Sequence, residues 1–133
     1  MKRMVQRAVA VVAAITMLSA LGACGGGQSA NGSDEDAINV VASVNQWGTV
    51  AKALGGGNVN VTSIINSTNV EAHDYEPTTA DIAKLQKAQV IVVNGADYDS
   101  WAVKAAKSTK ANVVNAAEVS GKKSGDNPHV WFS

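Results

Sequence analysis

The sequence contains two histidines, His73 and His129, and each lies where its imidazole could bind a metal ion. His73 belongs to the run H-D-Y-E-P-T, in which acidic residues surround the histidine, and His129 belongs to the later run N-P-H-V-W-F. A neutral imidazole is a good ligand for zinc and other first-row divalent ions, and neighbouring carboxylates can supply charge and outer hydrogen bonds. The ordinary alternative is that each histidine is a solvated loop residue. The choice between a metal site and two solvated histidines depends on whether the fold brings the two imidazoles close together.

Short apolar runs alternate with amphipathic segments along the chain after residue 37. The β-branched and apolar runs are typical of strands, and the segments between them have the three- and four-residue spacing of helices that bury one face. This order, with short connections, is expected of right-handed βαβ units, so we predict an α/β fold in which helices flank a parallel sheet. The predicted strands are residues 38–42, 59–65, 89–95 and 111–116, and the predicted helices are residues 44–54, 79–88 and 99–107.

The predicted helices have recognisable ends. Ser43 is the expected N-cap of the first helix, and Gly55 to Gly57 is its expected stop. Thr78 and Asp81 form a capping-box pattern at the start of the second helix. The side chains expected to face the core are Val44, Trp47, Val50, Ala51 and Leu54 in the first helix, and Ile82, Leu85 and Ala88 in the second.

The predicted topology places both histidines at one edge of the sheet. Open parallel sheets bind ligands in the loops at the carboxyl ends of their strands. His73 follows the second predicted strand and His129 follows the fourth, so we expect their side chains to project into one crevice. Glu71, Asp74 and Glu76 are then further metal ligands, outer hydrogen-bonding partners of the site or solvated charges, and the residues alone leave these three alternatives open.

Other conspicuous residues have ordinary interpretations. Tyr75 is expected to pack against its own loop, and Asn94 with Gly95 is expected to form a common turn after the third strand. Trp101 and Trp131 either line a cleft or belong to the general packing. The polar segment from Glu118 to Asn127 is expected to be a loop.

The N-terminal region predicts export and lipid anchoring. Three basic residues precede an apolar block at residues 8–20 that is too short for a stable membrane span. The run L-G-A-C, which ends at the only cysteine, Cys24, resembles the lipobox of bacterial lipoproteins, in which the cysteine is lipidated. The alternative is an ordinary signal peptide with a stray cysteine. The predicted organisation is a lipoprotein signal peptide at residues 1–23, a flexible tether at 24–37 and a metal-binding lobe at 38–133.

Charge and cysteine content exclude several classes of protein. The whole chain has 11 basic and 11 acidic residues, and the predicted signal peptide removes three of the basic ones, which leaves a net charge near −3. This balance gives no support to a nucleic-acid surface or an anionic-lipid surface. A single cysteine excludes an intramolecular disulfide, so the fold must depend on its hydrophobic core.

The two histidine segments together resemble those of the zinc- and manganese-binding lipoproteins of ABC importers. The run from His73 to Thr78, continuing through D-I-A-K-L-Q-K-A-Q-V-I-V-V-N-G, is similar to the first metal-site segment of that family. The run N-P-H-V-W-F is similar to the second, and the lipobox precedes both. The resemblance covers essentially the whole mature chain.

This resemblance implies two α/β lobes joined by one long helix, with a divalent zinc or manganese ion held between them. It implies delivery of that ion to a membrane permease powered by a separate ATPase, by a monomer anchored through Cys24 outside the cell. His73 and His129 would be the two ligands of the N-terminal lobe. Two further ligands, a His or Glu and an acidic residue, would belong to a C-terminal lobe expected beyond Ser133.

The choice of ion and some functional classes stay open at this point. The loop after Glu118 lacks the histidines found in many zinc members, which weakens the case for that zinc subtype only slightly. A secreted metalloenzyme would use the same histidines with Asp74 or Glu76 around an open coordination position. A surface adhesin and a carrier of metal chelates are further alternatives. We expect a binding protein without enzymatic activity and without a nucleic-acid partner.

Overall fold

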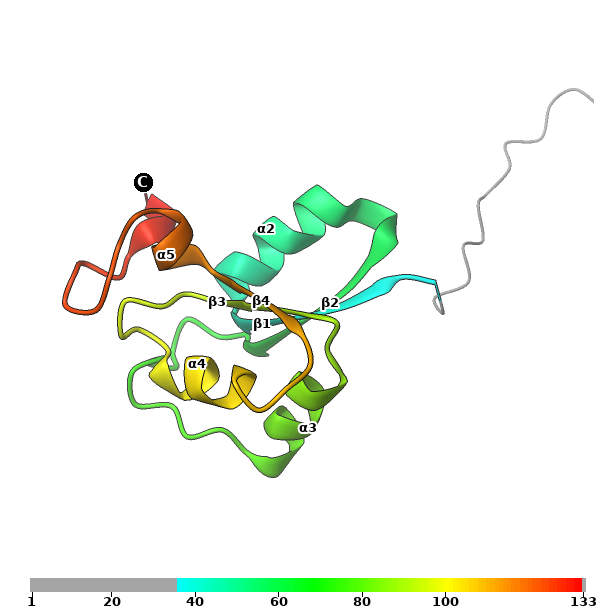
Figure 1. Ribbon diagram of the computed structural model, residues 1–133, viewed down its shortest axis with the longest axis horizontal. Coiled ribbons are helices and arrows are strands. Elements are labelled where there is room, and N and C mark those ends of the chain that lie inside the picture. Colours follow the sequence, from blue (N-terminus) through cyan, green and yellow to red (C-terminus); the bar gives the residue numbers. More distant parts are fainter. Residues whose placement is uncertain (1–35, 133) are drawn as a thin grey trace, which may run out of the picture. The chain divides into compact units, whose positions relative to one another are not determined.

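The computed structural model describes residues 36–132 and contains an open parallel sheet with helices on both faces (Figure 1). The predicted signal peptide, Cys24 and most of the predicted tether lie outside the described residues. The strands pair in parallel in the order β2-β1-β3-β4, so the predicted fold class is confirmed. Their bounds are Ile38–Val44 for β1, Val59–Ile65 for β2, Val90–Val93 for β3 and Asn112–Asn115 for β4.

The helices alternate with these strands. None of the helices within residues 36–132 has the length and apolar character that a bilayer crossing requires. Their bounds are Asn45–Gly55 for α2, Thr79–Lys87 for α3, Ser100–Ala106 for α4 and Ala116–Val119 for α5, with 3-10 turns η1 at Gly56–Asn58 and η2 at Val130–Phe132.

The strand order places a switch point between β1 and β3. The chain leaves β1 toward β2 in one direction and then crosses back to β3 and β4 in the other. Because crossovers between parallel strands are right-handed, α2 covers one face of the sheet, and α3 and α4 cover the other (Figure 1). The crevice at the carboxyl ends of β1 and β3 is where such a sheet binds ligands.

Two apolar clusters form the core. The larger lies between the sheet and the helices α3 and α4, and its least exposed members include Val41, Leu85 and Ile91. The smaller comprises Val44, Ile65 and Ala72 near the carboxyl edge of the sheet. The aromatic residues packed against this smaller cluster are Trp47, Tyr75, Tyr98 and Trp101. The predicted inward positions of the second helix are confirmed, since Leu85 and Ala88 are buried and Ile82 packs against them.

The first helix differs from its prediction. Ser43 is a buried residue of β1 and not a cap, and α2 begins after Val44 without a side-chain cap. Leu54, expected in the core, is 85% exposed. The reason is the close approach of α2 to β2 at Gly48, where a Cβ would lie 2.1 Å from the hydroxyl oxygen of Ser63. This approach sets the rotation of the helix and turns Leu54 toward solvent.

The turn between β3 and α4 is built around the buried carboxylate of Asp99. Its oxygens accept hydrogen bonds from the hydroxyl of Ser43, from the backbone N–H of Asn94 at 2.7 Å and from that of Gly95 at 2.9 Å. Gly95 has φ +77°, and a Cβ there would lie 2.1 Å from the side-chain oxygen of Asn115, so both conformation and space require glycine. Ala96 and Asp97 continue in the left-handed region, at φ 48° and 64°. The turn is therefore more constrained than the common turn predicted from the Asn-Gly pair.

Replacing Asp99 by asparagine is expected to lower the free energy of unfolding by about 3 kcal/mol. The substitution removes a buried charge on which three donors converge, and it turns amide hydrogens toward some of them. Urea unfolding of the wild type and the variant measures the difference. The exposed Glu76→Gln serves as the control and should change the free energy by less than about 0.5 kcal/mol. Equal midpoints for Asp99→Asn and the wild type would contradict this role for Asp99.

Candidate metal site

The structure brings both predicted ligand histidines against one tyrosine. His73 lies in the loop between β2 and α3, and His129 lies in the segment between α5 and η2. The ring of Tyr98, in the β3–α4 turn, contacts both, with its centroid 4.9 Å from that of His73 and 5.9 Å from that of His129. Both contacts are edge-to-face. Two imidazoles from distant parts of the chain therefore meet at the switch-point edge of the sheet.

Tyr98 is the central residue that the sequence reasoning missed. Its ring also packs at 5.0 Å against Trp131, which in turn lies 5.2 Å from His129, so Trp131 belongs to the site and not to the general core. Burial raises the pKa of the Tyr98 hydroxyl, and the negative charges of Glu71 and Asp99 raise it further. The phenol therefore stays protonated at neutral pH. It acts as a packing surface that both imidazoles contact.

The ring nitrogens of His129 are distinguished by Asn127. The side-chain oxygen of Asn127 accepts the backbone N–H of His129 at 3.1 Å and lies 2.8 Å from Nδ1 of the same histidine. A backbone N–H can only donate, so the amide atom facing it must be the oxygen. Nδ1 therefore carries the proton, and the lone pair is on Nε2, where a metal ion can bind it.

The segment that carries His129 is fixed to the end of β3 by Asn94. This fully buried side chain accepts a hydrogen bond from Nε1 of Trp47 at 2.9 Å and donates one to the carbonyl of Pro128 at 2.9 Å. Its own backbone carbonyl accepts the N–H of Ala117 at 2.8 Å. One asparagine thus connects α2, α5 and the residue directly before His129.

The loop that carries His73 is anchored on both sides of the histidine. Ala72 is 1% exposed and belongs to the smaller apolar cluster, whereas His73 itself is exposed. Two residues later, Tyr75 packs 4.9 Å from Trp101 and donates its hydroxyl hydrogen to Asp81 at 2.8 Å. Tyr75 therefore packs, but its aromatic partner is Trp101 of α4 and not its own loop as predicted.

Asp81 connects this loop to the start of α3. The predicted capping box is present: Asp81 accepts from the backbone N–H and the hydroxyl of Thr78, and the N–H of Asp81 donates to Thr78 Oγ1. Lys84 forms an ion pair with the same carboxylate at 3.2 Å. Burial alone would raise the pKa of Asp81, but the hydrogen bonds from Thr78, Tyr75 and Lys84 outweigh it and lower this pKa from 3.8 to about 2.

The carboxylates near the histidines do not complete a metal shell. Asp97 accepts hydrogen bonds from Ser124 at 2.6 Å and from the N–H of Gly125 at 2.9 Å, and these bonds, with a smaller contribution from His73, lower its pKa. Asp74 and Glu76 are exposed, and their predicted outer role stays a prediction. Across residues 36–132 there is no group of three or more His, Cys, Asp or Glu side chains that could hold a metal ion. This region offers two imidazoles toward a site that needs about four ligands.

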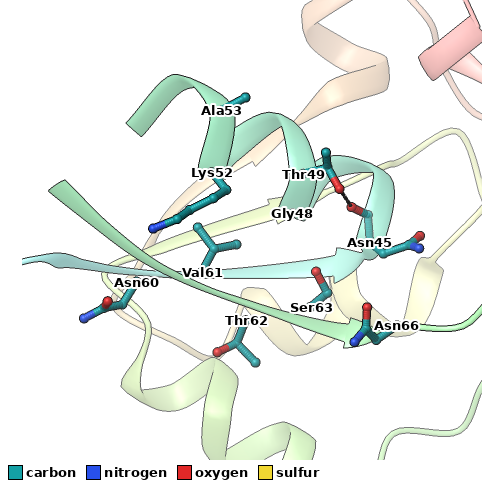
Figure 2. A pocket seen from close by; sticks show the side chains of 10 residues that line it. All are labelled: Asn45, Gly48, Thr49, Lys52, Ala53, Asn60, Val61, Thr62, Ser63 and Asn66. Atoms are coloured by element: carbon teal, nitrogen blue, oxygen red, sulfur yellow. Dashed lines mark hydrogen bonds between the residues drawn. The ribbon is translucent and has the colours of Figure 1, made fainter. Parts of the chain in front are cut away.

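A separate groove of about 700 Å³ lies between α2 and β2 (Figure 2). Amides and hydroxyls such as those of Asn45, Thr49 and Asn66 line it, together with Lys52, and it contains no histidine and no carboxylate. Its lining has no histidine or carboxylate of the kind that a zinc or manganese ion prefers, so this groove is not the candidate metal site.

Comparisons with known proteins agree with this geometry. Residues 40–133 match the family described as zinc-uptake complex component A, periplasmic, or ZnuA. The manganese-binding lipoprotein MntA of Halalkalibacterium halodurans is 30% identical over 128 residues, which cover 89% of this chain and 42% of that protein. The high-affinity zinc uptake system protein ZnuA of Bacillus subtilis is 34% identical over 100 residues, which cover 74% of this chain and 30% of that protein.

One solved structure is also similar to this chain. The crystal structure of the metal-dependent lipoprotein YcdH from Bacillus subtilis is similar with a TM-score of 0.64 and 34% identity, and the match covers 72% of this chain and 38% of that one. The chain therefore spans less than half the length of these relatives.

The carboxylate of Asp81, which caps α3, makes the free energy of unfolding depend on pH in the acidic range. The pKa of Asp81 is lower in the folded state, about 2, than its ordinary value of 3.8, so its contribution is complete above pH 4 and is lost as the pH falls through 2. We expect Asp81→Asn to cost about 2 kcal/mol of unfolding free energy at pH 6, and the difference from the wild type to shrink toward zero near pH 2. Urea unfolding at pH 6, 4 and 2.5 measures it. A difference that is constant over this range would exclude the assigned cause.

The protonated ring nitrogen of His129 can be observed directly. We expect long-range ¹H–¹⁵N correlation spectra of the metal-free protein at pH 8 to show the Nδ1–H form, since Asn127 accepts that proton. In Asn127→Ala the Nε2–H form should appear, because the acceptor is gone. His73 in the same spectra provides the internal control and should not change. An Nε2–H form in the wild type would disprove the assignment.

Proposed function

Because this chain belongs to the family of zinc-uptake complex component A, a periplasmic protein, we propose that it is the metal-binding N-terminal lobe of a solute-binding lipoprotein of an ABC importer. Its cargo is a divalent transition metal ion, zinc or manganese, captured outside the cell and passed to a membrane permease driven by an ATPase. The observation that carries the proposal is the meeting of His73 and His129 around Tyr98 at the switch point of the sheet.

The proposed ligands are His73 and the Nε2 atom of His129. The hydrogen bond from Nδ1 of His129 to Asn127 fixes the ring orientation and the free lone pair before a metal arrives. The remaining ligands would come from a second lobe, in keeping with relatives more than twice as long as this chain. Closure of that lobe would complete the shell and remove the ion from water, as a carrier requires.

The proposed arrangement fits a carrier better than an enzyme. A catalytic zinc site keeps three protein ligands and one open position for water or substrate. Residues 36–132 supply two histidines, and the nearby Asp97 carboxylate is already bound by Ser124 and Gly125. No observation favours a hydrolase or an adhesin over a binding protein.

The choice between zinc and manganese rests on the ligands still to be identified. Imidazoles suit both ions, and the intrinsic affinity order favours zinc at any site of nitrogen and oxygen ligands. The names of the relatives include both metals. We therefore propose zinc binding in vitro, with the physiological ion set by the second lobe and by supply.

The proposed membrane attachment is a lipid on Cys24. In this arrangement residues 1–23 are removed as a signal peptide, residues 24–37 are the tether, and residues 38–133 form the lobe. The names of relatives such as MntA, which include the word lipoprotein, support this organisation.

Replacing either histidine by alanine is expected to lower the affinity of the mature protein for zinc by more than about 100-fold. This exceeds the 10- to 100-fold cost of removing an outer partner of a ligand, because a direct metal bond is lost. Competition with a chromophoric chelator measures the affinity. Lys107→Gln, at the exposed C-terminal end of α4, is the control and should stay within about threefold of the wild type. Wild-type affinity in either alanine variant would remove that histidine from the site.

A further inference from the structure

Lysines collect at the edge of the sheet opposite to the histidines. Helices in a right-handed βαβ unit run antiparallel to the strands, so their C-terminal ends lie at the amino ends of the strands. Lys52 lies in the last turn of α2, Lys87 ends α3, Lys107 follows α4, and Lys110 lies between α4 and β4. All four are exposed. We call these four residues the lysine edge.

Hydrogen bonds show that these helix ends are neighbours. The side chain of Asn39, at the start of β1, donates to the carbonyl of Lys87 at 3.0 Å. Gln89 accepts the N–H of Asn112 at the start of β4 and donates its own N–H to Asn39. Lys52 Nζ reaches the carbonyl of Val59, the first residue of β2, at 3.2 Å. The strands β1 to β4 therefore all begin at this edge, which is on the right-hand side of Figure 1.

Acidic residues occupy the other edge. Glu71, Asp74, Asp97 and Glu118 lie in the loops or the short helix that follow the carboxyl ends of strands, near the histidines. Among the described acids, Asp36 lies two residues before β1 and adjoins the lysine edge. Net charge, which gave no sign of an anionic-lipid surface, does not reveal this separation.

The lysine edge also exposes apolar side chains. Leu54, near the end of α2, is 85% exposed, and Ile38, the first residue of β1, is 44% exposed. Lysines beside an exposed leucine are the combination that lets a protein surface rest on a charged lipid interface. The described part of the chain also begins at this edge, because β1 starts at Ile38 (Figure 1), and the predicted tether and anchor precede it in the sequence.

We propose that the lysine edge, with Leu54, docks the lobe on a bilayer of anionic phospholipid of the phosphatidylglycerol type. The ammonium groups lie among the phosphates, and Leu54 reaches the interface. The carboxyl edge with His73 and His129 then faces away from the bilayer. The docking rests on the proposed export and anchoring but not on metal binding.

The test uses the lipidated protein in vesicles of phosphatidylcholine alone or with 30% phosphatidylglycerol. A membrane-impermeant amine reagent and mass spectrometry give the modification rate of each lysine. We expect the lysine edge to be modified at least about fivefold more slowly in the anionic vesicles, in line with the attraction of each lysine to an anionic surface. Lys122 and Lys123 are the internal control and should react equally in both. Protection should vanish in 0.5 M NaCl, because salt screens the attraction.

A pair of double variants with equal net charge sharpens the test. Lys87→Gln with Lys110→Gln should abolish the protection of the remaining Lys52 and Lys107, whereas Lys122→Gln with Lys123→Gln should preserve it. Equal rates in the two kinds of vesicle, or equal loss in both variants, would overturn the proposal. Zinc titration of the same samples tests the metal site separately. If the protein binds zinc but its lysines are not protected, only the docking proposal is rejected. If the lysines are protected but the protein does not bind zinc, only the metal-binding proposal is rejected.

Discussion

The carboxylate of Asp99, buried where β1 and β3 end, is the interaction on which the rest of the site depends. A buried charge is tolerated only when donors surround it, and here the donors are the hydroxyl of Ser43 and two successive backbone N–H groups, of Asn94 and Gly95. To present both N–H groups the chain must turn sharply after β3, which explains the left-handed residues that follow. The same turn carries Asn94 at its start, directly after β3, and Tyr98 near its end, before α4.

These two neighbours of Asp99 connect the fold to its chemistry. Asn94 holds the carbonyl before His129 and the indole of α2, while Tyr98 contacts both imidazoles. Neither residue is a candidate ligand. The positions of the two candidate ligands are nevertheless coupled to them, because Asn94 bonds the residue before His129 and Tyr98 contacts both imidazoles.

Much of this arrangement could be predicted from the sequence, and the failures have physical causes. Local signals sufficed for the strands and for the capping box at Thr78, since each depends on spacing within a short segment. The common edge of the two histidines followed from the alternation of strands and helices, because all strands of a parallel sheet end at the same edge. Ser43 was assigned as a cap because its actual partner, Asp99, is 56 residues away. Leu54 has the spacing of a core residue, but the contact of Gly48 with β2 decides which face of α2 is buried. Asn127 was within reach of sequence reasoning, since an Asx side chain commonly bonds its own backbone two residues on.

The anchoring of both histidine segments has a consequence for how tightly and how quickly an ion is held. Side chains that are already ordered lose little conformational entropy when they coordinate, so more of the energy of each metal–nitrogen bond appears as affinity. Ala72 and Tyr75 on one side, and Asn94 and Asn127 on the other, supply that order in advance. If the proposed site holds an ion, relaxation of the loops of this lobe would contribute little to its release. The rate of release would then be governed by whatever supplies the other half of the coordination shell.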